Sequence, residues 1–437
     1  MKIALLSPKG PLYRHRSGIF KQSLRYAPLT LTTLAALIPA ELNAQVEIYD
    51  EGIENIDLDL QADLVGMTVI SGSSPRAYEI ADYFRKKGIP VVLGGSHVTL
   101  MPDEACLHAD SIVTGYAEQT WPQLLRDFCH GKMKSRYNQN GDFSLANQPY
   151  PRRDLVKRFS YSTVHTFEAT RACIHNCDFC VVPSAWGTSP YQKPIEEVIQ
   201  DIRQMRSKRL IFIDLNLIAD LDYAKNLFEA LIPLKISWFG LSTLLLAYDK
   251  ELLALVAKSG CRGLLIGFES LSGKNLHSSR KGFNDPNRFP EVMHIFHQHR
   301  ISIMGCFVFG MDEDTPDVFM KTAQFALDCK IDLPRYAILT PFPGTPLYHR
   351  LKEEDRVLTE DWSLYDGQHV VFEPANMSEE DLLSGTEKAW KHTYSYSNIY
   401  RRLAGSTRNP LINLAANIGY RFYANNLNKF YTCDVQL

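Results

Sequence analysis

The sequence predicts an α/β protein built from three parts: an N-terminal doubly wound, Rossmann-like parallel sheet, a partial (βα)6 TIM-type barrel and a small helical C-terminal domain. Two observations predict the first two parts. Short apolar runs alternate with amphipathic stretches over the first 130 residues, and the same alternation restarts near Phe159 for about six units. A length of 437 residues also exceeds one ordinary core, so two or three domains are expected.

Residues 1–135 are assigned to the doubly wound sheet. Strands are expected at 2–7, 46–49, 64–71, 91–93 and 111–114, and helices at 28–38, 74–87 and 120–129. Such sheets bind ligands beyond the carboxyl ends of their strands. Polar and glycine-rich residues follow three successive strands there, and the candidate binding residues are Ser71, Gly72, Ser73, Gly94, Gly95, Ser96, His97, Thr99, Gly115, Tyr116 and Glu118. Each alone could be a turn or surface residue, but their joint placement favours a site.

Residues 161–348 are assigned to the partial barrel, after a linker at 136–160 that is rich in charge, Asn, Gly and Pro. The barrel strands are expected at 163–169, 210–214, 236–239, 263–268, 302–309 and 335–339. Chemistry in such barrels gathers at the carboxyl ends of the strands. Residues 349–437 are assigned to a mostly helical extension, with one helix starting at Ser378 and carrying Glu379 and Glu380 in its first turn.

Three cysteines follow the first barrel strand with the spacing C-x3-C-x2-C: Cys173, Cys177 and Cys180. Three thiolates in one short loop can bind three irons of a [4Fe–4S] cluster and leave the fourth iron open. Zinc would need a fourth ligand, and the nearest candidate, His175, would have to fold back past its neighbours. Three clustered cysteines cannot all form disulfides with one another. The spacing therefore favours a cluster.

This loop resembles that of the radical S-adenosylmethionine (SAM) enzymes, in which an aromatic residue precedes the last cysteine, as Phe179 does here. The resemblance implies that SAM binds the open iron. It also implies that one electron, from a donor such as flavodoxin or ferredoxin, cleaves SAM to a 5′-deoxyadenosyl radical. Glu269 lies in a segment similar to the one whose glutamate contacts SAM. Asp214 and Ser242, at two other strand ends, are further SAM candidates, and each could equally cap the following helix.

The polar runs of the first region resemble the cobalamin-binding domain that precedes many radical SAM cores. The order is Ser-Gly-Ser-Ser, then Gly-Gly-Ser-His-Val-Thr, then Gly-x-x-Glu. The motif D-x-H-x-x-G is absent, so no histidine of that motif can ligate cobalt. The C-terminal extension resembles that of a bacterial cobalamin-binding radical SAM group that includes hopanoid methylases. Arg401 and Arg402, followed by an apolar helical run, could also lie on a membrane surface.

Together these resemblances imply a cobalamin-dependent radical SAM enzyme that methylates an unactivated carbon of a small-molecule or lipid substrate, with methylcobalamin as the methyl carrier. Two alternatives stay open. One is a radical rearrangement, ring contraction or cyclisation without methyl transfer, and the other is a non-enzymatic cobalamin or iron–sulfur sensor or carrier.

Composition restricts the remaining classes. The net charge is −2, from 47 basic and 49 acidic residues, which gives no footprint for nucleic acid. No stretch reaches the length of about 18 apolar residues needed to cross a membrane, and the N-terminus lacks the apolar core of a signal peptide. Nine cysteines, an odd number, fit a reducing compartment, so a cytoplasmic protein is expected.

Overall fold

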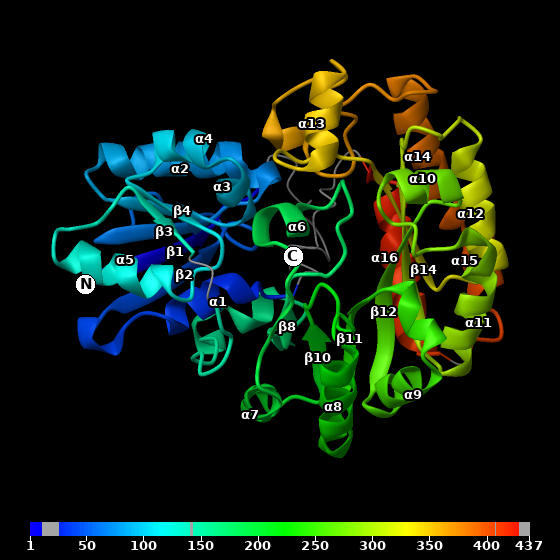
Figure 1. Ribbon diagram of the computed structural model, residues 1–437, viewed down its shortest axis with the longest axis horizontal. Coiled ribbons are helices and arrows are strands. Elements are labelled where there is room, and N and C mark those ends of the chain that lie inside the picture. Colours follow the sequence, from blue (N-terminus) through cyan, green and yellow to red (C-terminus); the bar gives the residue numbers. More distant parts are fainter. Residues whose placement is uncertain (11–25, 140–142, 407, 428–437) are drawn as a thin grey trace.

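The computed structural model describes residues 1–10, 26–139, 143–406 and 408–427. Two six-stranded parallel sheets stand beside each other, the first at the blue and cyan end of the chain and the second in its green to yellow part (Figure 1). The C-terminal helices lie on the far side of the second sheet from the first. The predicted α/β class with a helical C-terminal part is confirmed.

The first sheet has the strand order β2-β1-β3-β4-β5-β6, and all its pairs are parallel. Its strands are β1 (Lys2–Ser7), β2 (Gln45–Asp50), β3 (Leu64–Thr68), β4 (Val91–Gly94), β5 (Ser111–Thr114) and β6 (Arg136–Asn138). The first five match the predicted strands, whereas β6 falls inside the range assigned to the linker. Because β2 and β3 lie on opposite sides of β1, the order of the strands reverses at β1, and ligands bind at such points.

Helices cover both faces of this sheet, because alternate residues of each strand point to opposite faces. Ala4 and Leu6 of β1 face a core with α2 (Ser74–Lys86) and α4 (Pro102–His108). Ile3 and Leu5 face a second core with α1 (Leu29–Ala36) and α5 (Thr120–Cys129). The short helix α3 (Ser96–Leu100) follows β4 directly. The sheet is therefore doubly wound, as predicted.

The second sheet has the order β14-β13-β12-β11-β10-β7, again with parallel pairs. Its strands are β7 (Thr166–Phe167), β10 (Arg209–Phe212), β11 (Ser237–Ser242), β12 (Cys261–Glu269), β13 (Ser302–Phe309) and β14 (Leu333–Ile338). β7 and β14 are its two edges, so this is an open, partial barrel. Its outer helices are α7 (Ile195–Met205), α8 (Leu221–Leu231), α9 (Lys250–Lys258), α10 (Gly273–Ser278), α11 (Phe289–Gln298) and α12 (Val318–Asp328).

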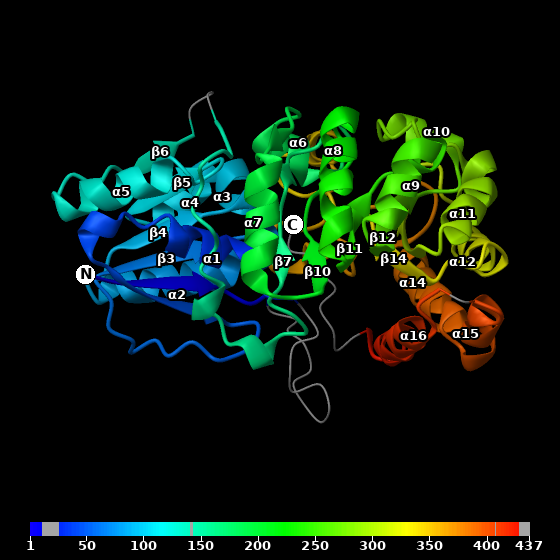
Figure 2. The same cartoon turned by 90° about the horizontal axis from the view of Figure 1, so that it is seen from below.

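Three short elements connect the cysteine loop to the barrel: the antiparallel pair β8 (Thr170–Arg171) and β9 (Tyr191–Gln192), and the helix α6 (Val181–Trp186). The helix α13 (Pro346–Glu353) begins where the last barrel unit ends. Seen from below, α8 and α9 lie above the strands of the barrel sheet, and α7 lies to the left of β7 and β10 (Figure 2). The inner side of the sheet faces the other way.

The C-terminal part consists of α14 (Glu379–Thr393), α15 (Tyr396–Leu403) and α16 (Pro410–Ala424). The Ser378 side chain caps α14, which confirms the predicted helix start. Buried Trp390 and Tyr394 belong to the same hydrophobic core as the barrel, so these helices pack directly on it. Among the described residues, no helix has the length and apolarity needed to span a membrane.

The placement of Arg402 on a membrane surface is wrong. Its side chain is fully buried, and it donates to the carbonyl oxygens of Ile331 and Asp332 at 3.1 and 2.9 Å. Only Arg401 of this pair is exposed, and it contacts Asp328 on α12. The sequence could not distinguish the two, because consecutive helical residues point in directions about 100° apart.

Candidate functional site

The cysteine loop is held by backbone hydrogen bonds to two distant segments. The Asp178 N–H donates to the Ser279 carbonyl at 3.2 Å, and the Leu347 N–H donates to the Asp178 carbonyl at 3.1 Å. Within the loop, the Cys180 N–H donates to the Cys177 carbonyl at 3.2 Å. These bonds fix the loop between the segment after β12 and the start of α13, at the carboxyl end of the barrel.

The environment of the three thiols fits an iron–sulfur cluster. Burial, with a smaller contribution from the neighbouring Cys177 and Cys173, raises the pKa of Cys180 to about 12, so the three groups lie close together. Burial likewise raises the pKa of Cys177 to about 11. Buried thiols ionise only when a positive charge lies beside them, and the iron ions of a cluster supply that charge. The Asn216 side-chain N–H lies 3.9 Å from the sulfur of Cys173 and can donate to it.

His175 does not take the role of a fourth zinc ligand. Its ring stacks on Phe283, with centroids 4.0 Å apart and planes 20° apart. Within the described residues, no three or more His, Cys, Asp and Glu side chains form a set that could hold a single metal ion.

Glu269 lies at the end of β12, beside the cysteine loop, in a buried ion pair. Its carboxylate accepts from Lys281 Nζ at 2.5 Å. Burial by itself would lower the pKa of Lys281, but Glu269 and Cys177 outweigh it and raise the pKa. Space for the carboxylate depends on Gly267, because a Cβ there would lie 2.0 Å from Glu269 Oε1. Glu269 also has a φ of +63° where the register of β12 and β13 shifts. The local backbone thus turns this carboxylate toward the cluster end.

The other SAM candidates differ in their surroundings. Asp214 is buried, and its carboxylate accepts from the backbone N–H groups of Ala169 and Thr170, so it caps no helix. Ser242 is buried, and its hydroxyl contacts the Thr243 carbonyl at 3.4 Å. Phe179 packs on the barrel core. Their roles toward SAM stay predictions, and for Asp214 the contacts favour a positioning role for the cysteine loop.

A large cavity lies between the first sheet and the barrel. Its volume is about 1620 Å³ with its open mouth included. The first sheet contributes Gly66, Gly94, Gly95, Ser96, Gly115, Tyr116 and Glu118, and the barrel side contributes Glu168, Arg171, Ala172, Trp186, Ile213 and Leu215. Six of the eleven predicted cobalamin residues therefore line one cavity, at the carboxyl ends of the strands, as sheet topology predicts. Its size suits a large cofactor.

Two glycine loops shape this cavity. Gly95 has a φ of +109°, and a Cβ there would lie 2.6 Å from the Val69 carbonyl oxygen, so only glycine fits. Thr99 lies just behind the wall, where its hydroxyl donates to the Gly95 carbonyl at 2.9 Å and accepts from the Gly115 N–H at 3.1 Å. Thr99 thus joins the loops after β4 and β5.

Ser71, Gly72, Ser73 and His97 do not line the cavity. His97 is fully buried, 3.2 Å from Ser71 Oγ and 3.3 Å from Glu104 Oε1. The other oxygen of Glu104 accepts from Trp362 Nε1 at 3.0 Å. This chain of contacts ties the first sheet to the segment after α13. A role of these four residues toward cobalamin stays a prediction.

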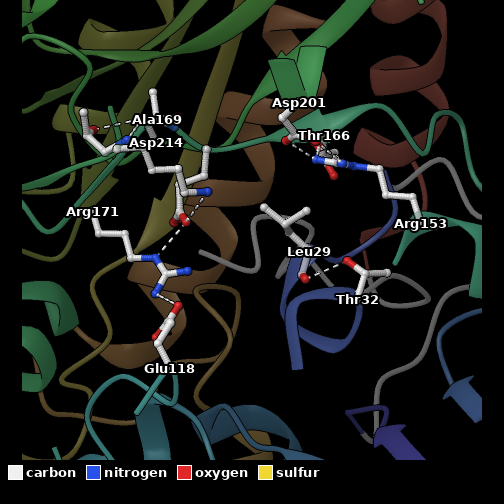
Figure 3. Close-up of polar contacts among 12 residues, drawn as sticks. Leu29, Thr32, Glu118, Arg153, Thr166, Ala169, Arg171, Asp201 and Asp214 are labelled. Carbon is white, nitrogen blue, oxygen red and sulfur yellow. Dashed lines mark hydrogen bonds and ion pairs between the residues drawn. The ribbon is translucent and has the colours of Figure 1, made fainter. Parts of the chain in front are cut away.

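One ion-pair network crosses the cavity. Arg171, two residues before Cys173, pairs with Glu118 of the first sheet and with Glu168, the latter at 2.7 Å (Figure 3). Its guanidinium also lies 5.1 Å from the centre of the Tyr116 ring. The Oε2 atom of Glu118 is buried and has no hydrogen-bond partner among the described residues. Cobalamin carries several amide side chains, and one of their N–H groups could donate to this oxygen.

A second buried pair anchors the linker. Arg153 forms two hydrogen bonds to the Asp201 carboxylate, at 2.6 and 2.8 Å, and donates to the Thr166 carbonyl (Figure 3). The linker is therefore attached to α7 and β7, on the barrel. Sequence reasoning missed Arg153, Arg171, Glu168 and Lys281, and only Arg171, next to the cysteine motif, carried a local signal.

The chain is 33% identical over 401 residues to the bacteriochlorophyllide d C-12(1)-methyltransferase of Chlorobaculum tepidum, which covers 87% of this chain and 86% of that protein. It belongs to the cobalamin-binding radical SAM enzymes. The B12 binding domain matches residues 24–125, the radical SAM superfamily residues 167–326, and a domain of unknown function, DUF4070, residues 345–415. As members of this family do, the chain uses a [4Fe–4S] cluster, SAM and cobalamin.

Two further relatives agree with this assignment. The bacteriochlorophyllide d C-8(2)-methyltransferase of Chlorobaculum tepidum is 30% identical over 416 residues, which covers 90% of this chain and 91% of that protein. The radical SAM methyltransferase TsrM from Kitasatospora setae, solved with cobalamin and a [4Fe–4S] cluster, has the same fold, with a TM-score of 0.63 and 18% identity. That match covers 81% of this chain and 75% of TsrM. The predicted family and cofactors are confirmed.

Proposed function

We propose that this enzyme methylates an unactivated carbon on a side chain of a bacteriochlorophyllide-like tetrapyrrole. The observation that carries the proposal is the similarity, over almost the whole chain, to two methyltransferases of bacteriochlorophyllide d. At 33% and 30% identity, both relatives are more similar to this chain than proteins that share only a fold. The sequence motifs alone imply no more than a small-molecule or lipid substrate, and a tetrapyrrole is a large apolar member of that class.

The geometry supports a reaction that uses both cofactors in one space. When bound, the reduced cluster and SAM supply a radical that removes hydrogen, and cobalamin supplies a methyl group. The protein must then hold the substrate between the two sites. Arg171 lies where the two cofactor sites meet, because it comes two residues before the first cysteine of the loop and its guanidinium pairs with Glu118 of the cobalamin domain. The cavity wall beside it carries the aromatic rings of Tyr116 and Trp186, which can pack on a flat apolar molecule.

The test is an anaerobic turnover assay with reconstituted enzyme, SAM, hydroxocobalamin, a reductant and bacteriochlorophyllide d. Methylation predicts a product heavier by one CH2 group, together with equal amounts of 5′-deoxyadenosine and S-adenosylhomocysteine. The C177A variant is the control, because it lacks one of the three predicted cluster ligands. Deoxyadenosine without methylated product would exclude this substrate, and no SAM cleavage under any condition would exclude the enzyme class.

A rearrangement or cyclisation is the second candidate. Relatives that are 24% identical include an anaerobic magnesium-protoporphyrin IX monomethyl ester cyclase of Cereibacter sphaeroides. Cyclisation would produce deoxyadenosine without S-adenosylhomocysteine, since no methyl group moves. We also propose that a small electron-transfer protein such as flavodoxin or ferredoxin reduces the cluster, and that the enzyme works in the reducing cytoplasm.

A further inference from the structure

The C-terminal helix α16 presents its polar face inward and its apolar face outward. Asn413 and Asn417 are buried. The side-chain N–H of Asn413 donates to Ser302 Oγ at 3.1 Å, and that of Asn417 donates to the Asp332 carbonyl at 3.0 Å. Surface helices normally bury their apolar face and expose the polar one. These two asparagines, together with Tyr420 and Tyr423 packed on the rings of α14, hold α16 on the barrel. The leucine and isoleucine side chains on its other face are not used in this packing.

Four side chains form the outward face, and we call them the apolar stripe. Leu411 is 82% exposed, and Ile412, Leu414 and Ile418 are 49%, 48% and 46% exposed. Residues 411, 414 and 418 recur at helical spacing, so they point to one side of α16, opposite Asn413 and Asn417. A contiguous row of exposed leucine and isoleucine on a stable helix marks an interaction surface.

Aromatic and basic side chains lie on α15, which packs against α16, and on α16 itself. Tyr396 and Tyr400 of the neighbouring α15 are 66% and 75% exposed. The Arg421 guanidinium stacks over the Tyr396 ring at 3.8 Å, and Arg401 is half-exposed beside Asp328. Amphipathic tyrosines and long basic side chains around an apolar face suit the boundary between lipid headgroups and acyl chains.

The charge of this segment identifies the kind of partner. Residues 388–432 contain seven Lys and Arg and no Asp or Glu, whereas the whole chain has a net charge of −2. Buried Arg402 does not add to the charge of this surface, which comes from exposed or half-buried residues such as Lys388, Arg401 and Arg421. Asp332 faces two of these residues, Arg402 and Arg408, from inside the protein. A second copy of the chain would bring an equally basic segment against this one. An anionic lipid surface instead complements the charge and accepts the apolar side chains.

The position of α16 allows such contact. Figure 2 shows α16 at the lower edge of the molecule, on the side of the barrel sheet opposite α8 and α9. Fifteen residues are too few for a helix that crosses the bilayer core of about 30 Å, so α16 would lie along the surface. We propose that the apolar stripe and its basic surroundings dock the enzyme on an anionic lipid bilayer, with α16 parallel to the membrane plane.

The test is co-sedimentation of the full-length, cluster-loaded protein with vesicles. Wild type should bind vesicles of phosphatidylcholine with about 30% phosphatidylglycerol, a content in the range where basic segments bind, and bind phosphatidylcholine alone more weakly. The variant L411S/L414S/I418S should bind the anionic vesicles at least about tenfold more weakly, because the apolar contribution is lost. The control is Leu107→Ser on α4, which removes an equally exposed leucine far from α16 and should bind like wild type.

Three outcomes would overturn the proposal. Two are binding of the triple variant at the wild-type level and no binding of wild type to either vesicle. The third is a wild-type dimer in sedimentation velocity that the triple variant abolishes, without lipid binding, which would assign the stripe to self-association. Cluster absorbance and the melting temperature check that the triple variant is folded, and the single variant L411S repeats the test with a residue that makes few contacts.

Discussion

Asp214 offers a sharp test of how the barrel positions the cysteine loop. Its buried carboxylate accepts from the Ala169 N–H at 3.0 Å, the Thr170 N–H at 2.5 Å and the Thr170 hydroxyl at 2.9 Å (Figure 3). These donors lie in the turn between β7 and β8, immediately before the cysteine motif. The D214A variant would leave all three donors without an acceptor in a buried place.

The magnitude follows from the number of donors. An orphaned buried donor costs about 1–3 kcal/mol, so with three donors D214A should lower the free energy of unfolding by at least about 3 kcal/mol. That is a large share of the 5–15 kcal/mol by which a typical domain is stable, taken as an order of magnitude. D214N keeps one amide oxygen as an acceptor and should cost only about 1–2 kcal/mol.

The titration of Asp214 gives a second signature. Burial raises its pKa to about 7 from its ordinary value of 3.8, and Glu168 raises it as well. The folded protein therefore binds this proton more tightly than the unfolded chain does. The free energy of unfolding should fall as pH rises from about 4 to about 7, and D214N should lack this part of the pH dependence.

The assay is urea unfolding followed by circular dichroism, anaerobically, with and without the cluster. D249A is the matched control, because among the described residues the Asp249 carboxylate accepts from one backbone N–H, that of Leu252, and its loss should cost about 1 kcal/mol. A D214A stability within 1 kcal/mol of wild type would refute this account. Unchanged stability with weaker SAM binding would assign Asp214 to SAM instead.

Three further predictions concern the cofactor sites. C177A should retain far less iron than the about four atoms per chain of one cluster, measured by iron assay and absorbance, and an unchanged content would exclude Cys177 as a ligand. G95A should lose cobalamin binding by at least about tenfold, because its Cβ would strike backbone, whereas Gly88, with a φ of +76° and nothing within 4 Å, should tolerate alanine at a cost of about 1 kcal/mol. R171Q should destabilise the protein by about 3–5 kcal/mol, since it leaves buried Glu118 without its cation, and R171Q/E118Q should recover part of the loss. An R171Q melting temperature equal to that of wild type would show that this pair contributes nothing.

Much of the fold could be predicted because it depends on local patterns. The spacing of apolar residues predicted β1 and β13 to the residue and α5 over its full length. Strand–helix alternation predicted two parallel sheets, since a parallel connection needs a crossover helix. β6 was missed, because an edge strand of three residues with one buried side chain carries almost no periodic signal.

The candidate site divides in the same way. The cysteine spacing and the glycine loops are local, and the sequence by itself determined the family, the cofactors and the strand ends at which the loops lie. Glu269 was predicted as a SAM contact because its flanking residues resemble a known segment, and that role stays a prediction. Its partner Lys281 was not predicted, since nothing in the eleven residues between them predicts that the chain returns.

Only the tertiary structure decided which side chains meet across the chain. Trp362 donates to Glu104, 258 positions away in the sequence, and Glu104 also contacts His97. These contacts hold the His97 ring in the interior, away from the cavity wall. The pairing of Arg171 with Glu118 likewise joins the barrel to the first sheet. The sequence could not predict which face of α16 packs on the protein and which faces outward. Burial and pairing depend on what packs against a residue, and that is set by the whole fold rather than by neighbours in sequence.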